Sequence, residues 1–326
     1  MTACVPRTDT PANPRRGSLA VVVALVIGLG LAAAPVAFQM FTRAPQGGTM
    51  IDDFQPYMQT TKIDAFRGYL DLIDKANTES LTLQQSLPDY DTQFVGAAGL
   101  NDQWPTIQTD MTDLLDRMDR NMGNYAAVAA LPSFDLFPWF FLLPGVIIAG
   151  LAAAALVKGR KGTRPRGLLI ALAVMGLGVV AAPAIFQMFT RAPKGGEMID
   201  DFRPMMTAQR VRNVQGYFIS LGGGEGQLRV GVVPAYEATG ASAADHPAIT
   251  QFSAEWPTIV GQFNPMIATM NDNVDNFQAV DAMPSFPLFP WFFVIPGALV
   301  AGAAAAALRR RETPPAPSPT PEKESS

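Results

Sequence analysis

Residues 38–54 read FQMFTRAPQGGTMIDDF, and residues 186–202 read FQMFTRAPKGGEMIDDF. The two stretches are identical at 15 of 17 aligned positions. A match of this length inside one chain indicates an internal duplication, in which one structural unit occurs twice. We therefore expect the 326 residues to form two copies of the same unit.

Two shorter matches extend the duplication toward the end of each copy. PSFDLFPWFF at residues 132–141 returns as PSFPLFPWFF at 284–293, and QWPTI at 103–107 returns as EWPTI at 255–259. The offset between equivalent residues is 186 − 38 = 148 early in the copies and 284 − 132 = 152 late. The second copy thus contains a net insertion of four residues in its middle.

Four apolar segments that contain no charged residue predict transmembrane helices. A helix of about 20 residues crosses the hydrocarbon core of a bilayer, which is about 30 Å thick. The fold class is therefore an all-α integral membrane protein built from a tandem duplication, each copy having two transmembrane helices that flank an extracytoplasmic helical hairpin. The four spans are residues 17–41, 136–157, 167–189 and 288–308.

The first apolar segment has a signal peptide as its alternative interpretation, because it ends in small residues at Ala34-Pro35-Val36-Ala37. Its equivalent at residues 167–189 lies in the middle of the chain, behind a basic stretch, where only a spanning segment is reasonable. We therefore interpret both as retained transmembrane helices.

Positive charge predicts the orientation of these spans. Residues 158–166, KGRKGTRPR, contain five Lys or Arg, and Arg residues also flank the first and last spans. Basic flanks stay in the cytoplasm, so residues 1–16, 158–166 and 309–326 are expected there, the two tails as disordered segments. Residues 42–135 and 190–287 then form two large extracytoplasmic domains of a multi-pass cell-membrane protein.

The predicted extracytoplasmic domains are acidic, with net charges of 6 − 14 = −8 and 6 − 10 = −4. Acidic surfaces repel phosphate backbones, so we expect no nucleic-acid partner. The only cysteine is Cys4, in the predicted cytoplasmic tail. The extracytoplasmic domains therefore have to be stabilised by packing without disulfides.

Apolar residues at helical spacing predict two long amphipathic helices in each extracytoplasmic domain, at about 51–73 and 107–125 and at the equivalent positions of the second copy. We expect each pair to form an antiparallel hairpin and the two hairpins to close one four-helix bundle. The second helices carry a flexible apolar seam, which either packs the core or opens to accept a lipid or a partner helix. The seam residues are Met111, Leu114, Met118, Phe263, Met266 and Met270.

Three local features complete the expected domains. Pro45 with Gly47 and Gly48 predicts a turn, and Asp52-Asp53 with Pro56 predicts the first turn of the following helix. Alternating apolar residues at 228–232 allow a short strand. The loops at the tips differ between the copies and are either unconstrained or a place where each copy meets its own partner.

Aromatic and small residues mark the predicted spans. Each copy re-enters the membrane through an aromatic cluster, which we expect at the membrane interface. Glycines and alanines at four-residue spacing, such as Gly28 and Ala32, suit close packing of helices. The candidate interface belt comprises Phe137, Trp139, Phe140, Phe289, Trp291 and Phe292.

Residues suited to catalysis are scarce. His246 is the only histidine, has no equivalent in the first copy and is expected to be a solvated loop residue. Asp110, Asp113, Asp116 and Asp119 suggest a cation site, but their equivalents are not acidic, so a solvated helix face is favoured. We therefore predict no catalytic, cofactor-binding or metal-binding residues and no enzymatic activity.

The spans contain no ionisable residue, which argues against ion-coupled transport and leaves a channel as a minor alternative. The layout of two spans around a helical exported segment is similar to that of bacterial four-helix-bundle sensor ectodomains, although the cytoplasmic pieces are too short for an output domain. The sequence favours a noncatalytic membrane protein whose paired hairpins bind, scaffold or regulate an envelope or transport partner. The alternative is a subunit that handles lipid or another hydrophobic ligand, and membrane lipids are expected partners in both cases.

Overall fold

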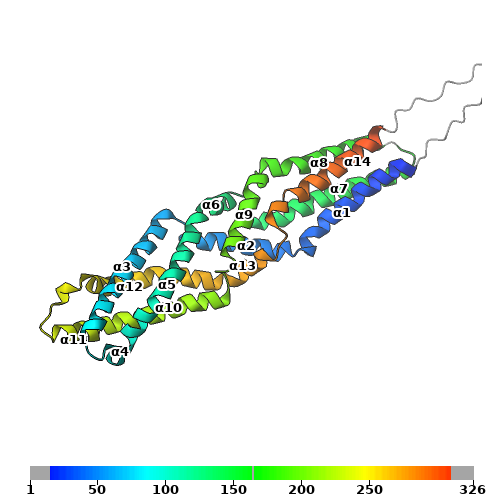
Figure 1. Cartoon of the computed structure of the whole chain (residues 1–326). Helices are drawn as coiled ribbons and strands as arrows, with labels where there is room; N and C mark the ends of the chain where they lie inside the picture. The colour runs from blue at the N-terminus through cyan, green and yellow to red at the C-terminus, as the bar shows by residue number, and fades with distance from the viewer. Residues whose placement is uncertain (1–14, 164, 310–326) are drawn as a thin grey trace, which may run out of the picture. The chain divides into compact units, whose positions relative to one another are not determined.

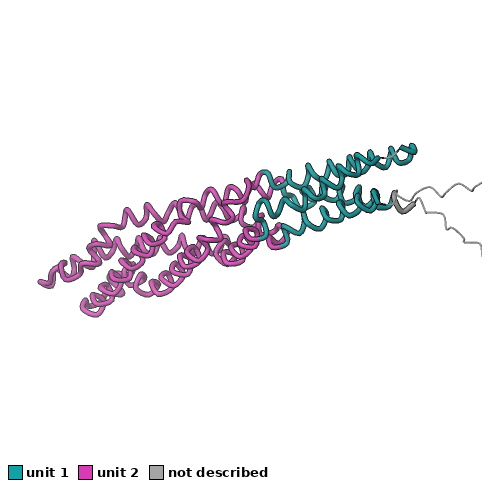
Figure 2. The backbone as a smooth tube through the Cα atoms, turned by 90° about the horizontal axis from the view of Figure 1, so that it is seen from above, with its two compact units in different colours: residues 1–40, 136–189, 288–326 teal, residues 41–135, 190–287 magenta. Residues whose placement is uncertain are grey.

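The computed structural model describes residues 15–163 and 165–309, so most of both predicted tails, with Cys4, lies outside the described residues. Within those ranges every regular element is helical and none is a strand. The chain divides into two compact units, coloured separately in Figure 2. Unit 1 comprises residues 1–40, 136–189 and 288–326, and unit 2 comprises residues 41–135 and 190–287.

Unit 1 contains four helices that are long and apolar enough to cross a membrane. They are α1 (Arg15–Ala37), α7 (Phe137–Arg160), α8 (Arg166–Ile185) and α14 (Trp291–Arg309), all labelled in Figure 1. The most extensive contacts pair α1 with α7 and α8 with α14, and α1 also packs against α14 and α7 against α8. The apolar segments therefore form a four-helix bundle, which supports a membrane-associated protein.

Glycines set the close approach within each pair of unit 1 helices. A Cβ atom built on Gly28 would lie 2.6 Å from the backbone nitrogen of Ala149, and one on Gly176 would lie 2.7 Å from that of Ala301. Contacts this short leave no room for a side chain, as in other small-residue helix interfaces. Gly30, in contrast, has no heavy atom within 4 Å of its Cβ position, so only part of the small-residue pattern serves packing.

Unit 2 is built around the long helices α3 (Thr60–Ser86), α5 (Val95–Arg120), α10 (Ala208–Gln227) and α12 (Pro247–Asp272), which Figure 1 shows side by side. Each of them contacts two others: α3 packs on α5 and α12, and α10 packs on α5 and α12. Shorter elements complete the unit. They are α2 (Met40–Phe54), α4 (Tyr90–Gln93), α6 (Met122–Ala129), η1 (Phe134–Leu136), α9 (Met188–Phe202), η2 (Leu228–Val232), α11 (Val233–Glu237), η3 (Ala243–Asp245), α13 (Val274–Asp281) and η4 (Phe286–Leu288).

One hydrophobic core fills the bundle of unit 2 and takes residues from both halves of the chain. Phe66 of α3 lies against Phe263 of α12, with ring centroids 4.3 Å apart, and both rings are fully buried. This confirms the prediction that the two halves share a common core. The prediction of only two helices in each segment was wrong. The first segment also contains the separate helices α2 and α6, and the second contains α9 and α13. In addition, α5 and α12 begin well before the predicted starts of the second helices.

The predicted turn at Pro45 was also wrong, because α2 runs through it without a break. The chain changes direction earlier, at Gln39, whose φ of 54° is left-handed, and Gln187 has the same φ at the equivalent place. Gly47 serves close packing instead of a turn. Its Cβ position lies 3.2 Å from the Phe134 ring and 3.3 Å from Val280.

Asp52 and Asp53 lie in the last turn of α2, not in the first turn of the next helix, and Pro56 lies in the turn that follows. The macrodipole does not favour carboxylates at this end of a helix. Asp53 is stabilised by another contact, since it accepts a hydrogen bond from Nδ2 of Asn273 at 3.0 Å. Its equivalent, Asp201, accepts one from Nδ2 of Asn121 at 2.6 Å.

Arginines make a second matched pair of contacts between the halves of unit 2. The Arg43 guanidinium donates to the Ala282 carbonyl at 3.0 Å, and the Arg191 guanidinium donates to the Ala130 carbonyl at 2.6 Å. Helix α2 of the first half thus binds the end of α13 in the second half, and α9 binds the end of α6. Two kinds of contact, each occurring twice, therefore hold the halves together.

The predicted strand at residues 228–232 is a π-helical turn that continues α10. Leu228 and Val232 are fully buried, whereas Val230 is 66% exposed. The buried residues Leu228 and Val232 are four positions apart, which is close to one helical turn. The same apolar residues therefore fit a helix as well as they fit a strand. Gly231 lets the ring of Phe94 come within 3.2 Å of its Cβ position, which accounts for the glycine in this turn.

Candidate hydrophobic ligand-binding site

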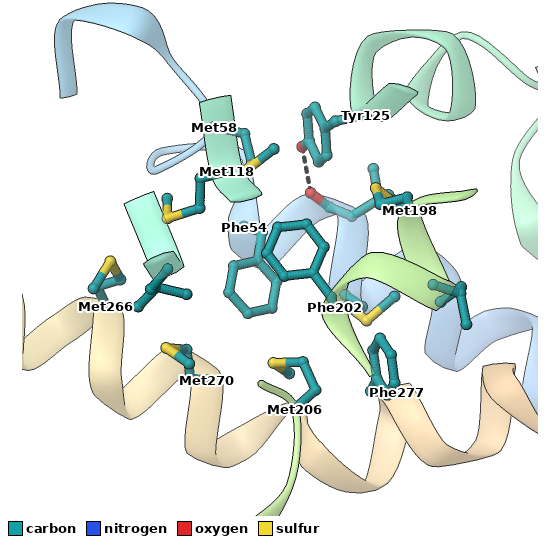
Figure 3. A pocket seen from close by; sticks show the side chains of 14 residues that line it. Phe54, Met58, Met118, Tyr125, Met198, Phe202, Met206, Met266, Met270 and Phe277 are labelled. Carbon is teal, nitrogen blue, oxygen red and sulfur yellow. Dashed lines mark hydrogen bonds between the residues drawn. The ribbon is translucent and has the colours of Figure 1, made fainter. Parts of the chain in front are cut away.

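A pocket lined almost entirely by apolar side chains lies inside unit 2 (Figure 3). The space that no protein atom occupies is about 600 Å³, part of it open to solvent. The cavity itself has a volume of about 60 Å³, which is well below the roughly 300–1,000 Å³ of most ligand pockets, although its lining is apolar like theirs. The lining residues are Met50, Ile51, Phe54, Met58, Leu114, Met118, Tyr125, Met198, Ile199, Phe202, Met206, Met266, Met270 and Phe277.

The lining consists of seven residues from the first half and their seven equivalents from the second. With the offset of 148, Met50, Ile51, Phe54 and Met58 correspond to Met198, Ile199, Phe202 and Met206. With the offset of 152, Leu114, Met118 and Tyr125 correspond to Met266, Met270 and Phe277. The pocket therefore lies where the two halves meet, and neither half supplies it alone.

Methionines make up seven of the fourteen lining residues. Their unbranched thioether side chains change rotamer at little cost and fit differently shaped apolar groups. In Figure 3 the side chains of Met118, Met266 and Met270 gather along one side of the pocket, with the Phe54 and Phe202 rings beside them. The wall can therefore adapt to a bound hydrocarbon group.

Tyr125 brings the single hydroxyl group of the lining. It donates a hydrogen bond to the Ile51 carbonyl at 2.5 Å, drawn as the dashed line in Figure 3. Burial raises the pKa of the Tyr125 hydroxyl, and the charge of Asp52 adds to this effect. The phenol therefore stays protonated, and its hydrogen is already bonded to the Ile51 carbonyl. The equivalent residue, Phe277, has no hydroxyl.

The structure brings four of the six predicted seam residues to this pocket. Leu114, Met118, Met266 and Met270 line it, whereas Met111 and Phe263 lie fully buried in the core of the bundle. Sequence reasoning missed Met50 and Met198, the residues at the ends of α2 and α9 that face the pocket. The sequence feature that could have indicated them is that methionine occurs in both copies, directly before Ile51 and Ile199.

A polar cluster flanks the pocket wall formed by α5. Asp201 accepts hydrogen bonds from Arg117 at 2.8 Å and from Asn121 at 2.6 Å, and Arg120 lies 3.4 Å away. The Arg117 side chain is 21% exposed, so this ion pair is partly shielded from solvent. It ties the end of α9 to the end of α5, and both helices contribute residues to the lining of the pocket.

The four aspartates of α5 pair with arginines. Burial alone would raise the pKa of the Asp110 carboxyl, but hydrogen bonds from Arg210 and Tyr217 and the Arg210 charge outweigh it and lower that pKa. Within residues 15–163 and 165–309, no group of three or more His, Cys, Asp or Glu is placed to hold a metal. The remaining pairs are Asp113 with Arg117, Asp116 with Arg67 and Asp119 with Arg67.

His246 is not the solvated loop residue that the sequence suggested, because only 7% of it is exposed. Its ring stacks edge-on against Tyr236, with centroids 4.8 Å apart, directly before α12. Neither ring nitrogen has a hydrogen-bond partner among the described residues. The imidazole therefore packs as an aromatic ring against Tyr236.

The candidate interface belt in unit 1 divides into buried and exposed residues. Phe137 and Phe289 are buried and pack edge-on at 5.4 Å, so they belong to the core of unit 1. Trp139 and Trp291 are 45% and 49% exposed, as expected of residues that face lipid headgroups. Phe140 and Phe292 are partly buried.

A scan against models of known protein families and a search of curated proteins found no match to this chain.

Proposed function

We propose that this chain is a noncatalytic membrane protein that binds a small apolar group, such as the end of one hydrocarbon chain of a lipid, in the pocket of unit 2. The supporting observation is the pocket itself, with fourteen apolar or aromatic residues and one hydroxyl that is already bonded. A ligand with a charged or strongly polar group would lose its hydration there without gaining partners. A hydrocarbon chain loses nothing polar and gains apolar contact.

The proposal includes the tandem duplication and the topology predicted from the charges. Equivalent helices have matching lengths, as in α2 and α9 with 15 residues each, and the Gln39 and Gln187 conformations are the same. Unit 2 would face the extracytoplasmic side, with both termini and residues 158–166 in the cytoplasm. In intact cells, cysteines introduced by Thr82→Cys and Ser242→Cys should then react with an impermeant thiol reagent, whereas Cys4 should not. Labelling of Cys4 would overturn this orientation.

Ligand binding is tested with the full-length protein in lipid nanodiscs and a fluorescent long-chain fatty acid as the probe. Met270→Trp places a larger side chain in the pocket and should abolish saturable binding of the probe. Val95→Trp is the matched control, since Val95 is 65% exposed and lies outside the pocket. Equal binding by the unmodified protein and Met270→Trp would disprove the proposal.

A second candidate function, binding of a partner protein, is favoured by an apolar groove between α10 and α12. The groove contains Phe218, Ile219, Trp256 and Val260, with Gln215 and Asn264 among its polar residues. An amphipathic helix with one apolar face is the partner that fits a groove between two helices.

The equivalent face of the first half is charged, which sets the groove of the second half apart. Ile219, Val260 and Ala268 correspond to Asp71, Gln108 and Asp116, and Asp116 there pairs with Arg67 at 2.8 Å. A photo-crosslinking residue at Ile219 should therefore give one discrete cross-linked protein in native membranes, and Val260→Arg should abolish it. The same probe at position 71 should give none. Identical products from both positions would exclude this candidate.

A further inference from the structure

The small cavity of unit 2 is lined by seven methionines, and their sulfur atoms can act as ligands. Three of these residues, Met118, Met266 and Met270, are at most 4% exposed and gather along one side of the cavity in Figure 3. A thioether is apolar, but its sulfur also binds soft metal ions such as Cu(I). This wall therefore has a chemistry that a wall of leucines would lack.

Helix geometry brings two of the three sulfur atoms to one place. Met266 and Met270 are four residues apart on α12, so they lie on the same face with Cβ atoms about 5–6 Å apart. Two histidines at this spacing bind one zinc ion in helical metal sites. Met118 comes from α5, in the other half of unit 2, and lines the same cavity. A metal ion held by all three would join the two halves.

The two halves supply different numbers of sulfur atoms to this side of the cavity. Met270 is the equivalent of Met118, whereas Met266 is the equivalent of Leu114, which has no donor atom. Helix α12 thus supplies two thioethers and α5 supplies one. Three neutral thioethers suit Cu(I), which is a soft ion with a single positive charge.

The rest of the lining does not suit harder ions. Ca²⁺ and Mg²⁺ need oxygen ligands, and Zn²⁺ needs thiolate, imidazole or carboxylate groups. The single hydroxyl of the lining, on Tyr125, already donates to the Ile51 carbonyl. The rings of Phe54 and Phe202 lie beside the methionines in Figure 3, and the faces of aromatic rings attract cations. We propose that the three methionines form a binding site for one Cu(I) ion.

The copper site goes beyond the proposed binding of an apolar group, because it depends on the sulfur atoms and not on the apolar surface. Leucine is close to methionine in volume and keeps the surface apolar, so Met→Leu removes a ligand and preserves the lining. Met111 provides the matched control, since it lies on the same helix as Met118, is fully buried and is outside the pocket. The sequence-based prediction of no metal site rested on carboxylates and His246, and did not consider thioethers.

Cu(I) binding is measured without oxygen on the full-length protein in detergent, by competition with the coloured chelator bathocuproine disulfonate. Every protein carries Cys4→Ser, because a thiol also binds Cu(I). Cys4→Ser alone should bind one ion per chain. Adding Met266→Leu or Met270→Leu should weaken binding by about tenfold or more, a loss that removal of even an outer-shell partner typically causes. Adding Met111→Leu should leave binding unchanged.

X-ray absorption at the copper edge provides a second measurement, and it should show sulfur neighbours without nitrogen or oxygen. Absence of Cu(I) binding by the Cys4→Ser protein would overturn the site, and so would equal affinities of the Met270→Leu and Met111→Leu proteins. If the leucine variants do not fold, X-ray absorption decides alone, and nitrogen or oxygen neighbours would exclude the site.

The same variants separate the copper site from the proposed binding of an apolar group. Met270→Leu should keep binding of the fluorescent fatty acid, because the wall stays apolar, while it weakens binding of Cu(I). A protein that binds no fatty acid but loses Cu(I) in Met270→Leu would retain the copper site and refute only the proposed function. Fatty-acid binding without Cu(I) binding would refute only the copper site.

Discussion

The side-chain amide of Asn273 donates a hydrogen bond to the carboxylate of Asp53 at 3.0 Å, although the two residues are 220 positions apart. Asn273 is completely buried at the junction of α12 and α13, and its amide also bonds the Thr269 carbonyl at 3.0 Å. Asn121 makes the equivalent pair of bonds, to Asp201 and to the Arg117 carbonyl. These asparagines hold the ends of α2 and α9 against the opposite half of unit 2.

Asn273→Ala should lower the free energy of unfolding by about 1–3 kcal/mol, since it removes the side-chain hydrogen bond to the Asp53 carboxylate. Chemical unfolding of the full-length protein, followed by tryptophan fluorescence, measures this loss. Asn271→Ala is the control, because Asn271 is exposed two residues earlier and should change stability little. Equal effects of the two substitutions would show that the contact contributes nothing.

Gly28→Leu should separate α1 from α7, because the added side chain would overlap the backbone of Ala149. We expect a clear fall in the thermal unfolding midpoint of the detergent-solubilised protein. Gly30→Leu adds the same side chain two residues away in open space, so its midpoint should stay near that of the unmodified protein. A midpoint for Gly28→Leu that matches Gly30→Leu would argue against close packing at this glycine.

Unit 2 should lose stability in acid through Asp110. The pKa of its carboxyl is lower in the folded protein than in the unfolded chain, where it is about 3.9. The unfolded state therefore binds the proton first, and the stabilisation present at neutral pH is lost as pH falls through this range. Urea unfolding at a series of pH values from about 5 down to 2 measures the loss. Asp110→Asn should flatten the profile, and an exposed control, Asp275→Asn, should not.

His246→Phe should preserve or raise the stability of unit 2. The imidazole is buried with neither nitrogen bonded among the described residues, and burial of an unpaired polar group is unfavourable. Phenylalanine keeps a ring against Tyr236 without that penalty. Chemical unfolding again provides the measurement. A large loss of stability would reveal that the histidine nitrogens have a role in the folded protein.

The core positions could be predicted from the sequence because burial imposes a helical period that is visible in both copies. Leu114 and Met118 follow that period, and both are buried. The same reasoning failed at Pro45 and Gly47, where residues typical of turns lie inside α2. A glycine needed for close contact with Phe134 looks the same in a sequence as a glycine needed for a turn.

The pocket could be predicted only in part. Its walls come from residues of both halves that face one another, and a helical period shows which positions are buried but not which ones face an unfilled space. No local sequence pattern predicts the contact between Asp53 and Asn273 either, because the two residues are far apart in the chain. Its trace in the sequence is that Asp201 and Asn121 occupy the equivalent positions, so the pair occurs twice.

The interlocking of the halves also affects how the chain is made. The core of unit 2 requires α12, which ends at Asp272, whereas the first half of that unit ends at Asp135. The ribosome adds the intervening 272 − 135 = 137 residues at about 5–20 per second, which takes roughly 7–27 seconds. During that interval α3 and α5 lack α10 and α12, the helices of the second half against which their apolar faces pack. The newborn first half is therefore the species most exposed to aggregation and proteolysis, and destabilising changes should reduce the yield of protein before they affect the finished fold.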